Sequence, residues 1–513
     1  MREETRTSSS ACTGLPASFM QFMKTLILQG SVWSKLSGPP AAIELVRGAL
    51  TIVQPKAQFT RSYQYGTWDG TIKFLRRPYN TFMTGLTARV VSILQLHGYT
   101  TEVLHGELPA PQPQLMPQLR GLVLRDYQAR AAEWAVKHYR VSIQSPTASG
   151  KTEIGAEIIR RCGLPTLWLT HRRVLMHQTA ERLGQRLDPQ FINKTDEIDV
   201  LDSGRLVLVA MVQTLARWPA KMPFWKHWGM IIVDECQHAS NDTWADIAMR
   251  CVGARYRIGL SGTVITGDPV KDMKLEGITG PLYTAAETQE LADRGFLATP
   301  LIKFVHPDPA SFPTYAQVRE RVYPKWRINP RGLRKLGGKL YQQMYLEGIV
   351  NNPHHLAAIV SVVKKHSSEK IFILFRDIEH KHGEYICSAV EKLPPYYVYY
   401  ASGSTSDVSR ETMLSAFRKD KHGVVFVAST IFDQGVDIPE IDVLILAGGG
   451  QSQINTLQRV GRALRPRPDK NTVLIYDIWA GQRPGHKDYL ANHSATREQD
   501  YLRQGFSVEH VRL

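Results

Sequence analysis

Two series of short apolar runs, separated by helical stretches, constrain the fold of this chain more than any other feature. The first series comprises VSIQ (141–144), TLWLT (166–170), LVLVA (206–210), MIIVD (230–234) and RIGL (257–260). The second comprises KIFILF (370–375), YYVYY (396–400), VVFVA (424–428), DVLIL (442–446) and TVLIYD (472–477). Continuous β-rich runs that alternate with helices are typical of strands buried on both faces of a parallel sheet. The sequence therefore predicts an α/β protein with two parallel-sheet lobes in tandem.

Composition divides the 513 residues into further segments. A chain of this length holds about three domains, at roughly 100–200 residues per domain. We expect a disordered tail over 1–18, a small α+β accessory domain over 19–108, a proline-rich linker over 109–118, the first lobe over 119–300, a connector over 301–350 and the second lobe with a C-terminal helix over 351–513.

Charge and composition limit the function classes. The chain has 63 Lys and Arg against 47 Asp and Glu, a net charge of +16. This excess favours a polyanionic partner, with nucleic acid ahead of an anionic membrane, although a basic surface also serves solubility. No apolar stretch reaches the ~18 residues of a membrane helix, and the polar N-terminus is a poor signal peptide, so we expect a cytoplasmic protein. Five cysteines without C-x-x-C spacing argue against a disulfide framework or a zinc ribbon.

The segment SPTASGKT (145–152) follows the first predicted strand and precedes a helical pattern. Such a turn aims backbone N–H groups and the positive end of a helix at phosphates. Ser149, Gly150 and Lys151 would then hold the phosphates of ATP, and the Thr152 hydroxyl would ligate Mg²⁺. Ser145 occupies the position of the first glycine of the usual pattern. Ala148 also stands where glycine is frequent, and an alanine fits a tight turn there only if its φ stays negative, so the sequence fixes the geometry of this loop less firmly.

Two carboxylates, Asp234 and Glu235, follow the strand 230–234. Asp234 would hold Mg²⁺ through water, and Glu235 would polarise the water that attacks the γ-phosphate. We expect Gln237 and His238 to couple this site to the facing lobe. The hydroxyls of Ser261–Thr263 would link hydrolysis to movement, although a capping turn explains that segment nearly as well.

In the second lobe, Gln458, Arg462 and Arg465 have the spacing of residues on one face of a helix. These side chains fit arginine fingers that reach a γ-phosphate, whereas the simpler alternative is a solvated basic face. The segment Ala428–Pro439 lies just upstream and carries Thr430, Gly435 and Asp437 in a polar loop.

In their order and spacing, these motifs resemble those of superfamily 2 helicases, a resemblance that spans about 120–480. It implies RecA-like lobes, Tyr127 and Gln128 at the adenine, and Gly435 and Asp437 at the nucleotide. It also implies contacts with nucleic-acid phosphates near His171, Arg172, Thr214 and Thr430. The forms RDYQ (125–128), DECQ (234–237) and FDQGVDIP (432–439) are similar to the XPB-like and restriction-motor group of DNA translocases rather than to DEAD-box RNA helicases.

The N-terminal segment narrows the resemblance further. YGTWDG (65–70), FMTGL (82–86) and HGY (97–99) resemble the accessory domain of UvsW-type recombination helicases of bacteriophages, and 493–506 resembles their closing helix. Residues 59–82 interleave seven aromatic residues with Arg61, Lys73, Arg76 and Arg77. We expect most of the aromatic residues to form the core of the small domain, and the four basic residues to contact DNA.

Taken together, these features predict an ATP- and Mg²⁺-dependent DNA helicase or translocase that remodels branched DNA in recombination and repair. Three alternatives stay open: a duplex translocase that never separates strands, an RNA helicase, and a binding scaffold without ATPase activity. We expect a monomer in a bacterial or phage-infected cell, with single-strand-binding or recombination proteins as partners and no membrane.

Overall fold

The computed structural model describes residues 24–106, 118–194, 206–322, 333–376, 381–393, 396–420, 423–429, 441–450, 472–482 and 488–512. The predicted tail and nearly all of the predicted linker lie outside these ranges. The chain forms two compact units. The first ends at Tyr283, and the second runs from Thr284 and also takes residues 144–153 and 172–178.

A seven-stranded sheet forms the first lobe, in the order β13-β7-β12-β11-β8-β10-β9. Its strands are β7 (Arg140–Gln144), β8 (Thr166–Thr170), β9 (Ile192–Lys194), β10 (Val207–Met211), β11 (Met230–Asp234), β12 (Tyr256–Ser261) and β13 (Leu282–Thr284). The registered pairs among β8 to β12 are parallel. Strands β8 and β11 are buried along almost their whole length, as expected for strands that are covered by helices on both faces.

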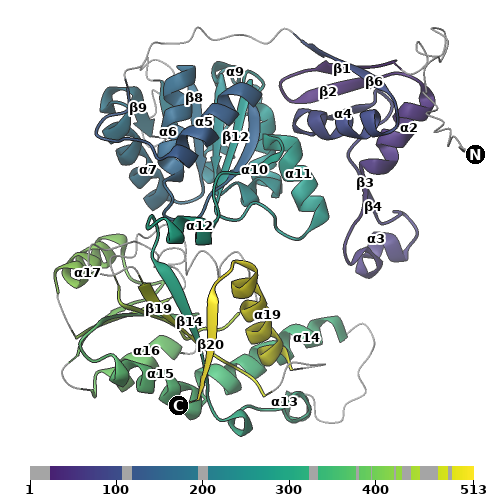
Figure 1. Cartoon of the computed structure of the whole chain (residues 1–513). Coiled ribbons are helices and arrows are strands. Elements are labelled where there is room, and N and C mark those ends of the chain that lie inside the picture. Colours follow the sequence, from purple (N-terminus) through teal and green to yellow (C-terminus); the bar gives the residue numbers. More distant parts are fainter. Residues whose placement is uncertain are drawn as a thin grey trace, which may run out of the picture. The chain divides into compact units, whose positions relative to one another are not determined.

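Helices flank this sheet (Figure 1). They are α5 (Asp126–His138), α6 (Lys151–Cys162), α7 (Arg173–Arg186), α8 (Val212–Leu215), α9 (Phe224–His227), η4 (Cys236–Ser240), α10 (Asp242–Arg250) and α11 (Pro269–Thr279). Local sequence sets the ends of α11. The Asp268 carboxylate accepts bonds from the N–H groups of Val270 and Lys271, and Pro269 supplies a preset φ at the first position.

The N-terminal residues form a small α+β domain, as predicted. Its sheet has the order β5-β2-β1-β6, and a separate hairpin pairs β3 with β4. The elements are β1 (Lys24–Gln29), β2 (Trp33–Ser37), α2 (Pro40–Ala49), β3 (Thr51–Val53), η1 (Ala57–Phe59), α3 (Arg61–Gln64), β4 (Thr71–Lys73), β5 (Thr81–Met83), η2 (Thr84–Leu86), α4 (Thr87–Leu96) and β6 (Thr100–His105). Strand β6 pairs parallel with β1, whereas β2 pairs antiparallel with both β1 and β5.

The expectation that most aromatic residues of 59–82 lie in the core is wrong. Phe74 and Phe82 are buried, but Phe59, Tyr63, Tyr65 and Tyr79 are 44–78% exposed. The core of the small domain is aliphatic instead, with Ile27, Leu36, Val46, Leu86, Val90 and Leu94 all buried. Aliphatic side chains from α2, α4 and the sheet already fill the interior, so the aromatic residues of the η1–α3 segment remain on the surface.

The second lobe has a seven-stranded sheet in the order β16-β17-β15-β18-β19-β14-β20. Its strands are β14 (Thr299–His306), β15 (Lys370–Phe375), β16 (Tyr397–Ala401), β17 (Val424–Ser429), β18 (Val443–Leu446), β19 (Thr472–Ile478) and β20 (Ser507–Arg512). All ten strands predicted in the two lobes are confirmed, with ends that differ by at most one residue. Each registered pair of this sheet is parallel. Two RecA-like α/β lobes in tandem are therefore confirmed.

Further helices complete the second unit. They are α12 (Thr288–Asp293), α13 (Tyr315–Val322), α14 (Leu333–Tyr345), η6 (Leu346–Val350), α15 (Pro353–Lys365), α16 (His382–Val390), α17 (Asp407–Lys419) and α19 (Tyr489–Arg503). Helix α19 overlaps the segment 493–506, in which a closing helix was expected, and begins four residues before it. Its Arg497 is 2% exposed and donates to both oxygens of the buried Asp477, at 2.7 and 2.8 Å. Tyr501 donates a further bond to Asp477, at 2.9 Å, so this carboxylate is fully engaged.

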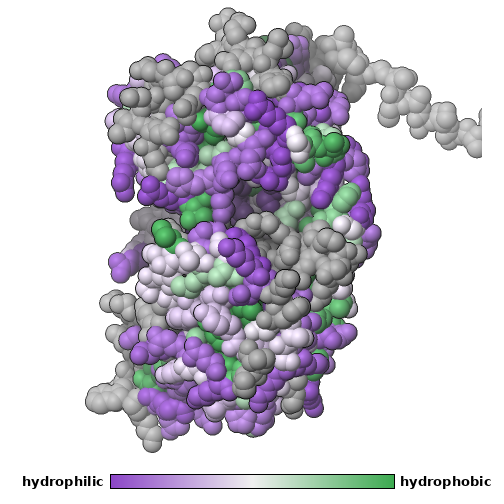
Figure 2. All heavy atoms as spheres, turned by 90° about the vertical axis from the view of Figure 1, so that its left-hand side faces the viewer, coloured by the Kyte–Doolittle hydropathy of each residue, from purple (hydrophilic) through white to green (hydrophobic). Residues whose placement is uncertain are grey.

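The outer surface is polar over most of the face shown in Figure 2, with scattered hydrophobic side chains between hydrophilic ones. Within the described ranges, no helix combines the length and the apolar character that crossing a membrane requires.

The Arg497–Asp477 pair gives a stability prediction. Replacement Arg497→Ala leaves a carboxylate buried without its cation, and loss of one partner of such a pair costs about 3–5 kcal/mol. We expect thermal unfolding of the full chain to shift down by at least about 6 °C, at roughly 2–4 °C per kcal/mol for a lobe of this size. The matched control is Arg418→Ala, which removes an exposed pair with Glu411 and should shift the midpoint little. Equal shifts in the two variants would contradict the prediction.

Candidate active site

The phosphate loop connects β7 to α6, as predicted. Ser145, at the position of the missing glycine, is fully buried, and its Oγ lies 2.6 Å from the Oγ of Ser149. The Ser149 hydroxyl also donates to the carbonyl of Pro146, at 2.6 Å. These bonds link the two ends of the loop through side chains. The departure from the glycine pattern at 145 thus supplies an internal contact that glycine cannot make.

The backbone at Ala148 differs from the expectation. Ala148 has φ +66° and Gly150 has φ +84°, so the loop places two residues in the left-handed region. The tight turn needs this geometry, and the sequence meets it with glycine at only one of the two positions. An L-residue there costs roughly 1–2 kcal/mol, because its Cβ approaches the following carbonyl oxygen. The loop therefore stores local strain at the predicted phosphate site.

Lys151 and Thr152 begin α6, where the helix N-terminus favours anions. The Lys151 ammonium donates to the carbonyl oxygens of Ser145 and Pro146, at 3.4 and 3.3 Å. The lysine side chain thus folds over the loop with which it is expected to hold the phosphates. Thr152 is half-buried at the second position of the helix, and its hydroxyl and the Asp234 carboxylate are oxygen donors of the kind that Mg²⁺ prefers. These residues fit a magnesium–ATP site.

Asp234 ends β11, and Glu235 follows it in the left-handed region, with φ +53°. The Glu235 N–H donates to Asp234 Oδ1 at 3.0 Å, while its own carboxylate accepts a bond from Gln237 Nε2 at 2.9 Å. An unusual backbone angle at a carboxylate that is fixed by neighbouring donors is a feature of functional sites. Glu235 is thereby held in one orientation beside Asp234.

A hydrogen-bonded chain joins this acidic turn to the next strand. The Gln237 side chain is almost fully buried, and its Oε1 accepts a 2.6 Å bond from the Ser261 hydroxyl. Ser261 Oγ in turn accepts from the Thr263 N–H at 2.9 Å. The contact that the structure gives Gln237 is therefore with the Ser261–Thr263 segment of its own lobe. One amide group therefore connects Glu235 to this segment.

The residues expected at the nucleic acid follow neighbouring strands, β8 and β10, of the same sheet. His171 packs against His238 with ring centroids 5.3 Å apart, and both rings lie near Trp244. Gln213 Nε2 donates to the His171 carbonyl at 3.0 Å, which ties the ends of the two strands together. Burial lowers the pKa of His238, although the Glu235 carboxylate opposes this shift. Arg172 and Thr214 are half-buried, and their role in binding stays a prediction.

Tyr127 and Gln128 lie in the first turn of α5. Tyr127 is fully buried, with Arg125 Nη1 donating to its hydroxyl at 3.2 Å, so it packs inside the lobe. Gln128 Oε1 accepts a bond from the Arg125 N–H at 2.9 Å and thereby caps the helix. The predicted contact of Gln128 with adenine stays a prediction.

The four basic residues of the accessory domain are all exposed. Lys73 pairs with Asp69 at 2.7 Å, Arg77 pairs with Glu44 at 3.3 Å, and Arg76 stacks on Trp33 at 4.0 Å. Arg61 begins α3, the helix that also presents the exposed Tyr63. Sequence reasoning placed the cations on the surface but missed the aromatic residues beside them.

Six predicted site residues lie outside the described residues: Thr430, Gly435, Asp437, Gln458, Arg462 and Arg465. Their assignments stay predictions.

Comparison with known proteins agrees with this arrangement. Residues 121–266 match the family "Type III restriction enzyme, res subunit", and residues 354–467 match "Helicase conserved C-terminal domain". The chain is 27% identical over 382 residues to the DNA 3'-5' translocase XPB2 of Sulfurisphaera tokodaii, covering 70% of this chain and 82% of that protein. It is 23% identical over 498 residues to the ATP-dependent DNA helicase uvsW of Enterobacteria phage T4, covering 88% and 91%. A structure described as an HsdR subunit fragment of a type I restriction enzyme from Vibrio vulnificus shares the fold, with a TM-score of 0.54, 20% identity, and coverage of 78% of this chain and 70% of that one.

The left-handed backbone at Ala148 gives a prediction with an unusual sign. Ala148→Gly removes the Cβ conflict, and we expect it to stabilise the protein by about 0.5–1 kcal/mol after the entropy of the unfolded glycine is subtracted. The control is Ala129→Gly on α5, which should destabilise by about 1 kcal/mol because glycine is unfavourable in a helix. Thermal unfolding of both variants without nucleotide measures the difference. If Ala148→Gly loses as much stability as the control variant, the conclusion that the loop is strained at Ala148 is contradicted.

Proposed function

The chain belongs to the XPB-like and UvsW-type group of superfamily 2 DNA helicases, and on that basis we propose that it remodels branched DNA in recombination and repair. The remodelling would consist of branch migration, fork regression, strand unwinding or strand annealing. ATP hydrolysis is the energy source that the family implies, and Mg²⁺ is the cation that the donor set of Thr152 and Asp234 fits.

The hydrogen-bonded chain from Glu235 through Gln237 to Ser261 is the observation that carries the proposal. A static nucleotide-binding protein needs only the phosphate loop and a magnesium ligand. A motor also needs the hydrolysis site to change the position of another segment. In this lobe Glu235, which we expect to orient the attacking water, is connected to Ser261 by the side chain of Gln237. We propose that Arg462 and Arg465 complete the hydrolysis site and that bound Mg²⁺ neutralises charge on the phosphates.

Two relatives point to different outputs of the motor, since one is named a translocase and the other a helicase. The accessory domain favours contact with unpaired bases over simple duplex translocation. Its exposed Phe59, Tyr63, Tyr65 and Tyr79 lie on the segment that carries Arg61 and Arg77. Aromatic faces stack on bases that are not paired, whereas cations bind the backbone of any strand. We therefore place strand separation ahead of duplex translocation.

The first test is Lys151→Ala, assayed as ATP hydrolysis with and without DNA. We expect loss of DNA-stimulated turnover by a factor of about 10² or more, because the ammonium that stabilises the transferring phosphoryl group is removed. Strand displacement from forked, Holliday-type and simple-tail DNA, with an RNA duplex for comparison, should fall in parallel. The control is Lys137→Ala, an exposed lysine near the end of α5.

Unchanged turnover in Lys151→Ala would exclude the assigned phosphate site. A wild-type protein that displaces simple tails and RNA as well as forks would retain the helicase activity but remove the preference for branched DNA.

Salt dependence tests the accessory surface. We expect Arg61→Ala to weaken DNA binding and to reduce the slope of log affinity against log salt by about 1, because one phosphate contact is lost. Fluorescence anisotropy at several salt concentrations measures the slope. Lys56→Ala, on the same exposed segment, shows whether any lost cation has this effect. An unchanged slope in Arg61→Ala would place the DNA elsewhere.

A further inference from the structure

Helix α11 contacts η4 and β12 of the first lobe, which carry the acidic turn and Ser261, and it also contacts the accessory domain. It packs against η4, the turn that directly follows Glu235, and against η2 of the small domain. Its last residues reach β7, where the Ser142 hydroxyl lies 2.7 Å from Thr279 Oγ1 and donates to the Gly280 carbonyl at 3.2 Å. Strand β7 leads directly into the phosphate loop. One helix thus borders the strand before the loop, the acidic turn and the accessory domain.

The segment between Thr263 and α11 is firmly tied to the helix. The Asp272 carboxylate accepts bonds from the N–H and the hydroxyl of Thr266, at 2.8 and 2.6 Å, and from the Gly267 N–H, at 3.2 Å. Ser261 is already bonded both to Thr263 and to Gln237. A shift of Ser261–Thr263 therefore reaches the first turn of α11 after only a few residues.

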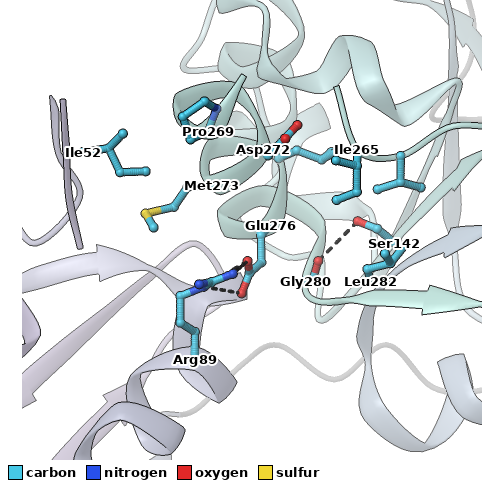
Figure 3. A pocket seen from close by; sticks show the side chains of 12 residues that line it. Ile52, Arg89, Ser142, Ile265, Pro269, Asp272, Met273, Glu276, Gly280 and Leu282 are labelled. Atoms are coloured by element: carbon cyan, nitrogen blue, oxygen red, sulfur yellow. Dashed lines mark hydrogen bonds and ion pairs between the residues drawn. The ribbon is translucent and has the colours of Figure 1, made fainter. Parts of the chain in front are cut away.

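On its other side, α11 meets the accessory domain too closely for side chains to intervene. A Cβ on Gly85 of η2 would lie 2.0 Å from the Glu276 carbonyl oxygen, and a Cβ on Gly277 would lie 2.6 Å from the Met83 side chain. Arg89 of α4 reaches across and pairs with both oxygens of Glu276, at 2.5 to 3.1 Å (Figure 3). A second anchor joins the buried Arg140 and Arg257 of the lobe to the Ser31 carbonyl. The two glycines permit backbone contact, and the arginines fix it.

Beside this close contact lies a cavity of ≈ 380 Å³. Figure 3 shows Ile52 of the β3–β4 hairpin on one side, and Met273 and Ile265 on the side of α11 and its preceding loop. The pocket is partly open to solvent. The helix beside it is held at Glu276 by Arg89 and at Asp272 by Thr266 and Gly267.

We propose that α11 couples the accessory domain to the ATP site, so that DNA held by the accessory domain changes the rate of ATP hydrolysis through Glu276, Asp272 and Ser261. The inference rests on the proposed function, because it takes the accessory surface to bind DNA. The coupling that we propose includes the affinity for nucleotide as well as the rate of hydrolysis. Because coupling between two binding equilibria is reciprocal, the nucleotide state then also changes the affinity of the accessory domain for DNA.

The test is Arg89→Ala in the full chain, assayed as ATP hydrolysis over a range of DNA concentrations. Arg89 touches neither the phosphate loop nor the exposed aromatic segment, so basal turnover without DNA should stay within about twofold of wild type. We expect the stimulation by saturating DNA to fall about threefold to tenfold, within the usual range of coupling energies. The charge exchange Arg89→Glu with Glu276→Arg should restore part of the stimulation. The matched control Lys24→Ala removes an exposed accessory-domain pair with Glu102, remote in sequence from the docking residues, and should leave stimulation unchanged.

The outcomes separate this inference from the proposed function. If wild-type protein shows no stimulation by DNA, the proposed function fails first. If wild-type protein and Arg89→Ala are stimulated equally, only the coupling through α11 is overturned. A loss of basal turnover as large as the loss of stimulated turnover would also overturn it, because the pair would then maintain the ATP site itself. Circular dichroism checks that Arg89→Ala is folded. A second experiment measures the affinity for DNA in the presence of ADP and of a non-hydrolysable ATP analogue. If the affinity of Arg89→Ala for DNA depends on the nucleotide as strongly as that of wild type, the proposal is contradicted.

Discussion

The parallel pairing of β11 with β12 is the constraint on which the active site depends. Their register sets Asp234 opposite Leu260, so Glu235 and Ser261 emerge side by side at the carboxyl edge of the sheet. At that separation one glutamine spans the gap, bonded to Glu235 at 2.9 Å and to Ser261 at 2.6 Å. A shift of one residue in this register would send alternate side chains to the opposite face and break the link. The buried sheet therefore fixes chemistry as well as fold.

The strands that the sequence predicts share one physical property. They are continuous β-rich runs, and most of them are buried on both faces, so little polar alternation obscures the pattern. The edge strand β16 is an exception, with only Ala401 buried, and its run of tyrosine and valine still predicts it. Strand β20, with the sequence SVEHVR, escapes such reasoning because it lies at the edge of its sheet and is largely exposed. Strand β14 escapes it because Pro300 and Lys303 interrupt the apolar run. Both strands are placed by tertiary pairing, in which β14 lies between β19 and β20.

The site shows the same division between local and tertiary information. The phosphate loop and the acidic strand end follow from residue type and spacing, whereas the left-handed Ala148 and the direction of Gln237 do not. Propensity assigns a negative φ to alanine, but the turn between β7 and α6 imposes a positive one. The predicted burial of the aromatic residues of 59–82 is wrong for a related reason, because aliphatic side chains fill most of the small core. Sequence reveals which groups are present, but competition for space decides where they point.

Close docking of the accessory domain has a consequence for how binding energy is used. A domain on a flexible tether would hold DNA near the motor without affecting hydrolysis, since a tether raises only the effective concentration. Here Gly85 and Gly277 allow backbone contact, and Arg89 adds an ion pair with Glu276. Strain from the DNA that we propose the accessory domain to bind would therefore pass into α11 and not dissipate in a linker. The two glycines have no role in chemistry. A larger side chain at Gly85 would nevertheless meet the backbone of α11 and push the domain away from this helix, and one at Gly277 would force the Met83 side chain to move.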